Sequence, residues 1–321
     1  MEPAPFPAAG LALTPTTPAD HPAVADLITR AHPDWARTAA DLDRFDEMRL
    51  AGEVFERVLA RQGGKVVGMA EVSTPRMDGH PGWLNLDVVT LERDLFGPLR
   101  AWAEATAARH QAHTLITRLK ERWWEKELWE AAGYAEHDRM WLSVLDLTTL
   151  DFGKFAAQED RAKAAGVTLR PLSELGPFDE AQQRRLYDLI AALLRDVPSA
   201  APVAVLPFEG WQQRFGSIKH PEGLWLAVAP NGDWVGLNEL HLPVSSAPHM
   251  LQNGLTGVLP AWRGEGIAYA LKLAAARSAL GRGFTHARTG NHSVNAPMLA
   301  INENLGFVRE AATVTLRRDI R

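Results

Sequence analysis

The sequence predicts an α/β (α+β) protein made of two similar domains, each built from strands and helices. Three observations predict this class. The chain has 321 residues, which is enough for two domains of ordinary size. Strand-like apolar runs alternate with helical patterns in both halves, and the order of these elements in the first half returns in the second.

The clearest repeated element is a β-hairpin. Two strand-like runs flank a glycine-containing turn in each half, at 55–61 and 65–74 around Gly63-Gly64, and at 224–229 and 234–242 around Asn231-Gly232-Asp233. Gly68 and Glu71 correspond to Gly236 and Glu239 at one constant offset. Unrelated α/β domains also share hairpins and helices, but the same order at similar spacing favours duplication.

The domain boundary is expected in the middle of the chain. Residues 151–165 are charged and alanine-rich with helical spacing, and Gly166 is a natural stop for such a helix. We therefore expect an N-terminal domain at 1–150, a connecting helix at 151–165 and a C-terminal domain at 166–321.

Composition narrows the functional classes. A net charge of −5 gives no case for a nucleic-acid partner. The chain has no cysteine, which excludes disulfides, thiolate metal sites and a cysteine nucleophile, and its histidines show no ligand spacing, so no metal is expected. No apolar run is long enough to span a membrane, and the first residues lack the features of a signal peptide. We expect a cytoplasmic protein.

The most informative segment follows the strand-like run 254–258. It reads Arg263-Gly264-Glu265-Gly266, and a helical pattern begins at Ile267. Glycines let backbone N–H groups converge, and the start of a helix favours a negative charge. The segment therefore predicts an anion site, although an ordinary strand-to-helix turn has the same form. It is neither a dinucleotide fingerprint nor a P-loop.

A second motif lies downstream, with Asn295 followed by Asn304-Leu305-Gly306-Phe307. Together with Arg263-x-x-Gly266-x-Ala268, in this order around a strand, it resembles the GNAT superfamily of acyl-CoA-dependent N-acyltransferases. The resemblance is specific over the last hundred residues or so. The repeat resembles tandem GNAT proteins with the two-domain arrangement of mycothiol synthases. The resemblance implies two domains, each with a mixed, mostly antiparallel central sheet flanked by helices.

The resemblance also implies acetyl-CoA as co-substrate and the residues that hold it. The pantetheine arm of the coenzyme would lie along 255–258, and backbone N–H groups of the loop would hold the pyrophosphate. The implied coenzyme residues are Val258, Leu259, Arg263, Gly264, Gly266, Ile267, Ala268 and Asn295. Asn295 is equally compatible with a plain helix N-cap.

Two catalytic roles are then considered, an acid for the leaving thiolate and a base for the amine. Many GNAT enzymes have a tyrosine where this chain has Asn302, and an amide can hydrogen-bond a thiolate but cannot protonate it. The strand 249–258 carries no carboxylate, so Glu239 on the preceding strand is the best candidate base, with His241 on the same face. Glu239 has a structural alternative, as the counterpart of Glu71.

The N-terminal half departs from the pattern where the coenzyme loop should lie. Residues 91–98 have one glycine and a proline, and Glu92 and Asp94 would repel an anion. We expect this domain not to bind acyl-CoA but to shape the acceptor cleft. The acceptor loop is expected at 196–207, whose apolar residues suggest a small amine, and Asp188 or Asp196 could meet a cationic group.

Two functions are consistent with these features. The first is an N-acetyltransferase that moves an acetyl group from acetyl-CoA to a primary amine of a small molecule, by direct transfer in a ternary complex. The second is a non-catalytic acyl-CoA-binding regulator or sensor, which the missing tyrosine favours. Turnover with a matching amine separates them. The protein is expected to be a monomer or a homodimer.

Overall fold

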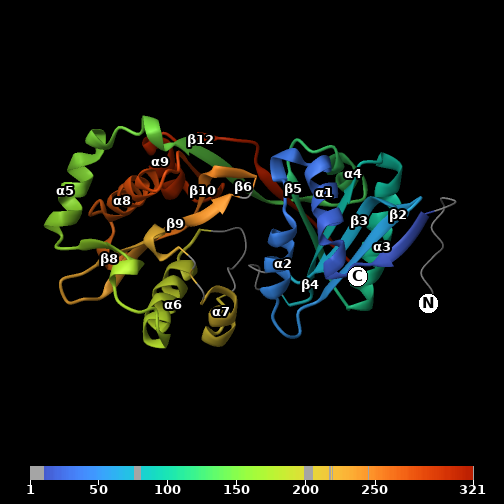
Figure 1. Cartoon of the computed structure of the whole chain (residues 1–321), viewed down its shortest axis with the longest axis horizontal. Coiled ribbons are helices and arrows are strands. Elements are labelled where there is room, and N and C mark those ends of the chain that lie inside the picture. Colours follow the sequence, from blue (N-terminus) through green and yellow to red (C-terminus); the bar gives the residue numbers. More distant parts are fainter. Residues whose placement is uncertain are drawn as a thin grey trace. The chain divides into compact units, whose positions relative to one another are not determined.

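The computed structural model describes residues 11–75, 81–198, 205–216, 218, 220–244 and 246–320. The chain divides into two compact units (Figure 1). Unit 1 comprises Met1–Arg139 and Ala311–Arg321, and unit 2 comprises Met140–Glu310.

Unit 1 contains a sheet with the strand order β1-β2-β3-β4-β5-β13. All neighbours are antiparallel except β4 and β5, which are parallel. The strands are β1 Leu11–Pro15, β2 Phe55–Gln62, β3 Lys65–Ser73, β4 Trp83–Thr90, β5 Thr114–Lys120 and β13 Thr313–Asp319. The helices are α1 His21–Ala31, α2 Ala39–Glu47, α3 Arg93–Arg109 and α4 Glu125–Ala131.

The hairpin β2–β3 packs closely beneath α3 because β3 carries a glycine at the contact. A Cβ on Gly68 would lie 2.7 Å from the side chain of Leu99 in α3, so any larger residue there would force Leu99 to move. Unit 2 repeats this contact. A Cβ on Gly236 would lie 3.3 Å from Leu271 of the corresponding helix. The repeated glycine therefore has a packing reason in both units.

Unit 2 contains a sheet with the strand order β6-β11-β10-β9-β8-β7, and β12 also pairs with β6. Only β10 and β11 are parallel. The strands are β6 Ala135–Asp146, whose first residues belong to unit 1, β7 Thr168–Pro171, β8 Leu224–Val228, β9 Trp234–Val244, β10 Ala247–Val258, β11 His286–His292 and β12 Val308–Arg309. The helices are α5 Ala156–Ala164, α6 Glu180–Arg195, α7 Phe208–Phe215, α8 Ile267–Gly281 and α9 Ala296–Leu305.

The two faces of β8 and β9 are covered by different helices (Figure 1). On one face, Leu224 and Leu226 pack with Leu189 of α6 and Trp211 of α7. On the other, small and aliphatic residues of the strands pack with α5 and α8. This alternation follows from the strand period of two residues. The predicted fold class, a mixed and mostly antiparallel sheet flanked by helices in each half, is confirmed.

The units differ in their bounds from the expected domains 1–150 and 166–321. Strand β13, at the end of the chain, pairs along its length with β5 and so completes the sheet of unit 1. Residues 140–146 of β6 pair with β11 and complete the sheet of unit 2. The expected bounds had placed residues 140–146 in the N-terminal domain and residues 313–319 in the C-terminal domain. The expected connecting helix contains α5, which packs on α8 within unit 2, and Gly166 follows it with φ +82°.

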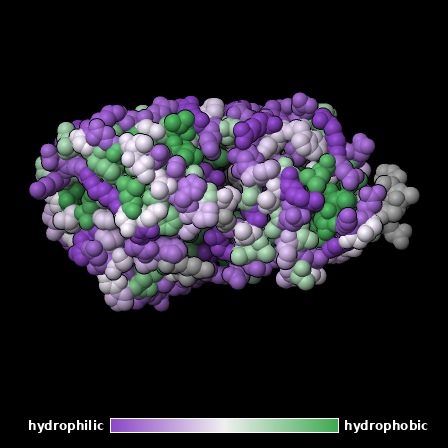
Figure 2. Space-filling model, turned by 45° about the horizontal axis from the view of Figure 1, so that its top comes forward, coloured by the Kyte–Doolittle hydropathy of each residue, from purple (hydrophilic) through white to green (hydrophobic). Residues whose placement is uncertain are grey.

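Hydrophilic residues predominate on the face drawn in Figure 2, where hydrophobic residues form small separate patches. Within the described part of the chain, no helix combines the length and apolar character needed to cross a membrane.

Candidate functional site

The sheet of unit 2 opens between β10 and β11. These parallel strands pair only over Met250–Asn253 and His286–Thr289. Beyond that point β10 continues to Val258 in pairing with β9 alone, while β11 continues to His292 in pairing with β6. On this side, no described strand pairs with residues 254–258, so an extended ligand can add hydrogen bonds to their backbone like a further strand.

The glycine loop lies at the end of this edge. Gly264 has φ +86° and Gly266 has φ +74°, backbone angles that residues with a side chain rarely adopt. Among the described residues, no acceptor faces the backbone N–H groups of 264–268. Gly266 is the N-cap of α8, so these donors converge at the start of a helix of 15 residues. Free N–H groups at a helix start form an anion site.

The two glycines of the loop are not equivalent. A side chain on Gly264 would meet nothing within 4 Å. A Cβ on Gly266 would collide with the backbone oxygen of Gln158 in α5. Gly266 is therefore needed for the packing of α5 as well as for the loop, and only Gly264 separates ligand binding from folding.

Arg263 and its neighbours are already engaged in the unliganded chain. Its Nε donates to the carbonyl oxygen of Val258 at 2.9 Å, and its Nη2 lies 2.9 Å from Asp196. The N–H of Arg263 donates to Pro260, and the N–H of Leu259 donates to Val235. Arg263 thus stabilises the turn after β10. Asp196, which the sequence suggested as a partner for a cationic ligand, is paired with Arg263.

Glu239 lies on β9, beside the open part of β10. Its Oε2 accepts a hydrogen bond from the N–H of Leu255 at 2.8 Å, and a Cβ on Gly254 would collide with the carboxylate. The pairing of β9 and β10 shifts register between Asn253 and Thr256, and this irregularity turns the Leu255 N–H toward Glu239. Burial raises the pKa of Glu239, and the Leu255 hydrogen bond opposes that shift only in part.

A lysine in α8 contacts β10 at the place where its pairing with β9 shifts register. Lys272 is 6% exposed, and its Nζ donates to Asn253 Oδ1 at 2.8 Å. The Nδ2 of Asn253 donates to the carbonyl oxygen of Glu239 and to Thr256 Oγ1. Burial lowers the pKa of Lys272 to about 7. Sequence reasoning missed Lys272, because a lysine in a helix usually lies at the surface.

The two asparagines of α9 have structural partners. Asn295 is the N-cap, and its side chain accepts a hydrogen bond from the N–H of Met298. Asn302 is 2% exposed, and its Nδ2 donates to Asn291 Oδ1 on β11 at 2.6 Å. The Oδ1 of Asn302 is buried without a hydrogen-bond partner. The described contacts do not join Asn302 to Glu239. The expected acceptor loop at 196–207 lies partly outside the described residues.

The corresponding turn of unit 1 has a different form. α3 begins at Arg93, three residues after β4 ends at Thr90. The N–H of Glu92 donates to Thr90 Oγ1, and the N–H of Leu95 donates to the carbonyl of Glu92. Two N–H groups at this helix start are therefore used within the protein, and Glu92 and Asp94 are exposed there.

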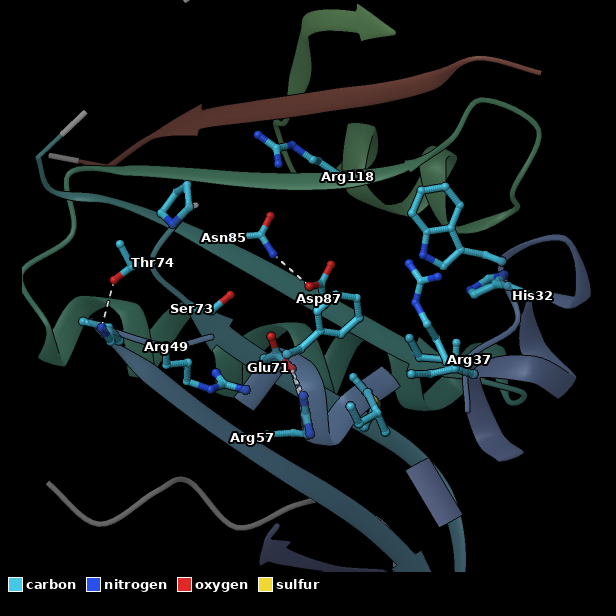
Figure 3. Close-up of a pocket in the computed structure, with 18 of the residues that line it drawn as sticks. His32, Arg37, Arg49, Arg57, Glu71, Ser73, Thr74, Asn85, Asp87 and Arg118 are labelled. Carbon is cyan, nitrogen blue, oxygen red and sulfur yellow. Dashed lines mark hydrogen bonds and ion pairs between the residues drawn. The ribbon is translucent and has the colours of Figure 1, made fainter. Parts of the chain in front are cut away.

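Unit 1 instead contains a cavity of about 330 Å³ between its sheet, α1, α2 and the segments that follow them (Figure 3). Strands β2 to β5 supply Arg57, Glu71, Asp87 and Arg118 to its lining. Sequence reasoning missed this cavity. The available signal was the alternation in β4, where Asn85 and Asp87 interrupt an apolar strand on one face.

A metal site needs several ligating side chains close together. In the parts of the chain that the structure describes, no group of three His, Asp or Glu side chains is placed to hold a metal ion.

Comparison with known proteins identifies the fold. No known family profile and no curated protein sequence matches the chain. Among solved structures, a GCN5-related N-acetyltransferase from Sphaerobacter thermophilus is 22% identical with a TM-score of 0.72, over 98% of this chain and 97% of that one. A tandem GNAT protein from the clavulanic acid biosynthesis pathway is 19% identical with a TM-score of 0.73, over 96% of this chain and 98% of that one. The chain has the tandem GNAT fold.

Proposed function

We propose that this protein is an acyl-CoA-dependent N-acetyltransferase whose C-terminal unit moves an acetyl group from acetyl-CoA to a primary amine of a small molecule, by direct transfer in a ternary complex. One observation carries the proposal. The free N–H groups of 264–268 lie at the end of the open edge of β10, so an anion site and a strand-like slot adjoin. This arrangement matches a pyrophosphate joined to an extended, amide-containing arm.

The chain's own residues fit that coenzyme. The N–H groups of Gly264, Gly266, Ile267 and Ala268 would hold the pyrophosphate, and the edge near Val258 would align the arm. Arg263, although paired with Asp196, keeps positive charge beside the loop. Leu259 and Asn295 would fix the backbone on either side of the slot, through their bonds to Val235 and Met298. Acetyl-CoA supplies the activated thioester when bound.

Glu239 is the proposed base. An amine attacks only after it loses its proton, and a base is effective when its pKa approaches the working pH. Burial raises the pKa of Glu239 in that direction, and the Leu255 hydrogen bond fixes the orientation of the carboxylate. No cationic side chain pairs with Glu239 among the described residues.

For Asn302 we propose a hydrogen-bonding role rather than that of an acid. An amide holds its protons at any ordinary pH, so Asn302 cannot protonate the leaving thiolate. Its Nδ2 bond to Asn291 ties α9 to β11, one of the two strands that bound the open slot. A proton for the thiolate would then come from water or from the attacking nitrogen, which sheds its second proton as the amide forms.

The test is calorimetric titration of acetyl-CoA into the wild type and into Gly264→Asp. The aspartate adds a negative charge at the loop in open space, so we expect binding in the wild type at one site per chain and none in the variant. Gly232→Asp is the matched control, because Gly232 also has a positive φ, +87°, and open space around it, in the hairpin turn between β8 and β9.

Loss of binding in Gly264→Asp alone would then justify a screen of amines for turnover. Unchanged affinity in Gly264→Asp would contradict the assignment of the loop. Binding without turnover across the amine screen would favour the regulator, and a second site in the wild type would contradict the expectation for unit 1.

A further inference from the structure

A row of four charged residues crosses the floor of the cavity in unit 1 (Figure 3). Arg57 of β2 lies directly across from Glu71 of β3, and Glu71 lies directly across from Asp87 of β4. Arg118 of β5 completes the row and acts electrostatically on Asp87. Two carboxylates thus face each other across neighbouring strands, an arrangement that destabilises a sheet unless a cation relieves it.

The two carboxylates are not equally satisfied. Glu71 Oε2 accepts a hydrogen bond from Nε of Arg57 at 2.7 Å and forms an ion pair with Nη2, also at 2.7 Å, and both side chains are largely buried. From the described residues Asp87 accepts a single hydrogen bond, donated by Asn85 Nδ2 at 2.8 Å. An ionised carboxylate has room for about four hydrogen bonds. Asp87 therefore has acceptor capacity left over, and it lines the cavity.

The walls around Asp87 are apolar and aromatic. Ile28, Leu42, Met69 and Val89 line the cavity, together with Trp35, Phe45 and Trp123. Cationic groups of the rim are used within the protein. The guanidinium of Arg37 stacks over the rings of Trp35 and Phe45, and Arg49 pairs with Asp46. The cavity thus presents one carboxylate with unused acceptor capacity beside apolar and aromatic walls.

We propose that this cavity binds a small organic amine, with its ammonium group at Asp87 and an apolar or aromatic body against the walls. A volume of about 330 Å³ suits a ligand of this kind. The inference goes beyond acetyl transfer and does not depend on it. It assigns to unit 1, which lacks the coenzyme loop, a binding role of its own.

A carboxylate ligand is the competing outcome. Arg57 has one nitrogen without a hydrogen-bond partner, Nη1, but this atom is enclosed by the protein. An anion could instead approach Arg118, which lines the same floor, but Asp87 and Glu71 stand in the same row and repel it. An ammonium group meets Asp87 directly.

Proton exchange distinguishes the two ligands. Burial and the charge of Glu71 raise the pKa of Asp87 to about 7, and Arg118 and Arg57 oppose that shift. An ammonium group beside Asp87 lowers this pKa, so the amine should release about half a proton at pH 7. An anion should take up a proton instead. The other charged groups that face the cavity are His32, Arg37, Arg49 and Glu53.

The experiment is calorimetric titration of 2-phenylethylamine at pH 7 in two buffers that differ in ionisation enthalpy. Its neutral and anionic analogues, 2-phenylethanol and 3-phenylpropionate, are titrated in parallel. We expect the amine to bind most tightly, with proton release and with affinity rising from pH 6 to pH 8. In Asp87→Asn, affinity should fall by about tenfold or more and proton release should vanish.

Asp94→Asn is the matched control, because it removes the same charge from an exposed position of unit 1 outside the cavity. Its affinity for the amine should equal that of the wild type. Tighter binding of 3-phenylpropionate with proton uptake, or no binding of the amine, would overturn the proposal. The wild-type proton count requires no variant, and acetyl-CoA titration in the same preparation reports separately on unit 2.

Discussion

Glu71 and Glu239 occupy the same position in the two repeats, yet their surroundings differ. Across from Glu71 on the preceding strand stands Arg57, whereas Leu224 stands across from Glu239. Glu71 is therefore paired with a buried cation, whereas the Leu255 N–H is the one hydrogen-bond donor to Glu239 among the described residues. One cross-strand residue thus decides whether the carboxylate has a cationic partner, and this difference supports the proposed role of Glu239 as a base.

The next strand differs as well. In unit 1, Asp87 stands directly across from Glu71. In unit 2, β10 shifts register near Glu239, and a glycine and a backbone N–H take the corresponding place. Unit 1 therefore has a charged cavity floor, whereas unit 2 has an open strand edge with a glycine loop at its end. The same plan supports two different sites.

The same substitution should have different effects at Glu239 and Glu71. Glu239→Gln should lower kcat/KM for the amine by roughly 10²–10⁴-fold, because the amide cannot accept a proton. In the wild type, kcat/KM should fall as the pH drops through the raised pKa of Glu239, and this acidic limb should be absent in the variant. Steady-state kinetics between pH 5 and pH 9 measure both. An unchanged acidic limb would remove Glu239 from the mechanism.

Glu71→Gln should act on stability instead. The substitution leaves Arg57, which is 7% exposed, as a buried cation without its carboxylate partner. We expect a loss of about 3–5 kcal/mol in the free energy of unfolding, measured by chemical denaturation. Acetyl-CoA affinity should be unaffected. A stability equal to that of the wild type would mean that the ion pair does not stabilise unit 1.

Substitutions of the two loop glycines, Gly264 and Gly266, should differ in their effect on stability. Gly266→Ala should destabilise unit 2 by about 3 kcal/mol, because the new methyl group meets the Gln158 backbone at a positive φ. Gly264→Ala meets open space, so only the backbone angle matters, at about 1 kcal/mol. Thermal unfolding of both variants measures the difference. Equal losses would show that α5 moves freely away from the loop.

Much of this was predictable from local patterns. The hairpins, the helix that begins at Ile267 and the glycine loop follow from turn residues and apolar spacing, which act over a few neighbours. The partner of the last strand was not predictable, because alternation in 313–319 predicts a strand without naming its neighbour. The row of Arg57, Glu71 and Asp87 joins three strands and emerges only from their register.

The burial of Lys272 also could not be predicted from local patterns, and its substitution should change stability least. It follows Leu271 as Arg100 follows Leu99, at the matched helix contacts of the two units. Arg100 pairs with Glu104 at 2.7 Å, whereas the buried Lys272 has, in the described part of the chain, Asn253 as its single hydrogen-bond partner.

Burial lowers the pKa of Lys272 from 10.5 to about 7, so between these values the unfolded chain binds more protons than the folded one. The free energy of unfolding should therefore rise with pH over this interval. Lys272→Met removes the titrating group, and its stability relative to the wild type should fall by about 1–3 kcal/mol from pH 7 to pH 10. Arg100→Met should show no such trend, since arginine stays charged throughout. Urea denaturation at pH 7 and pH 10 provides the comparison, and parallel profiles for Lys272→Met and the wild type would mean that Lys272 stays protonated in the folded protein.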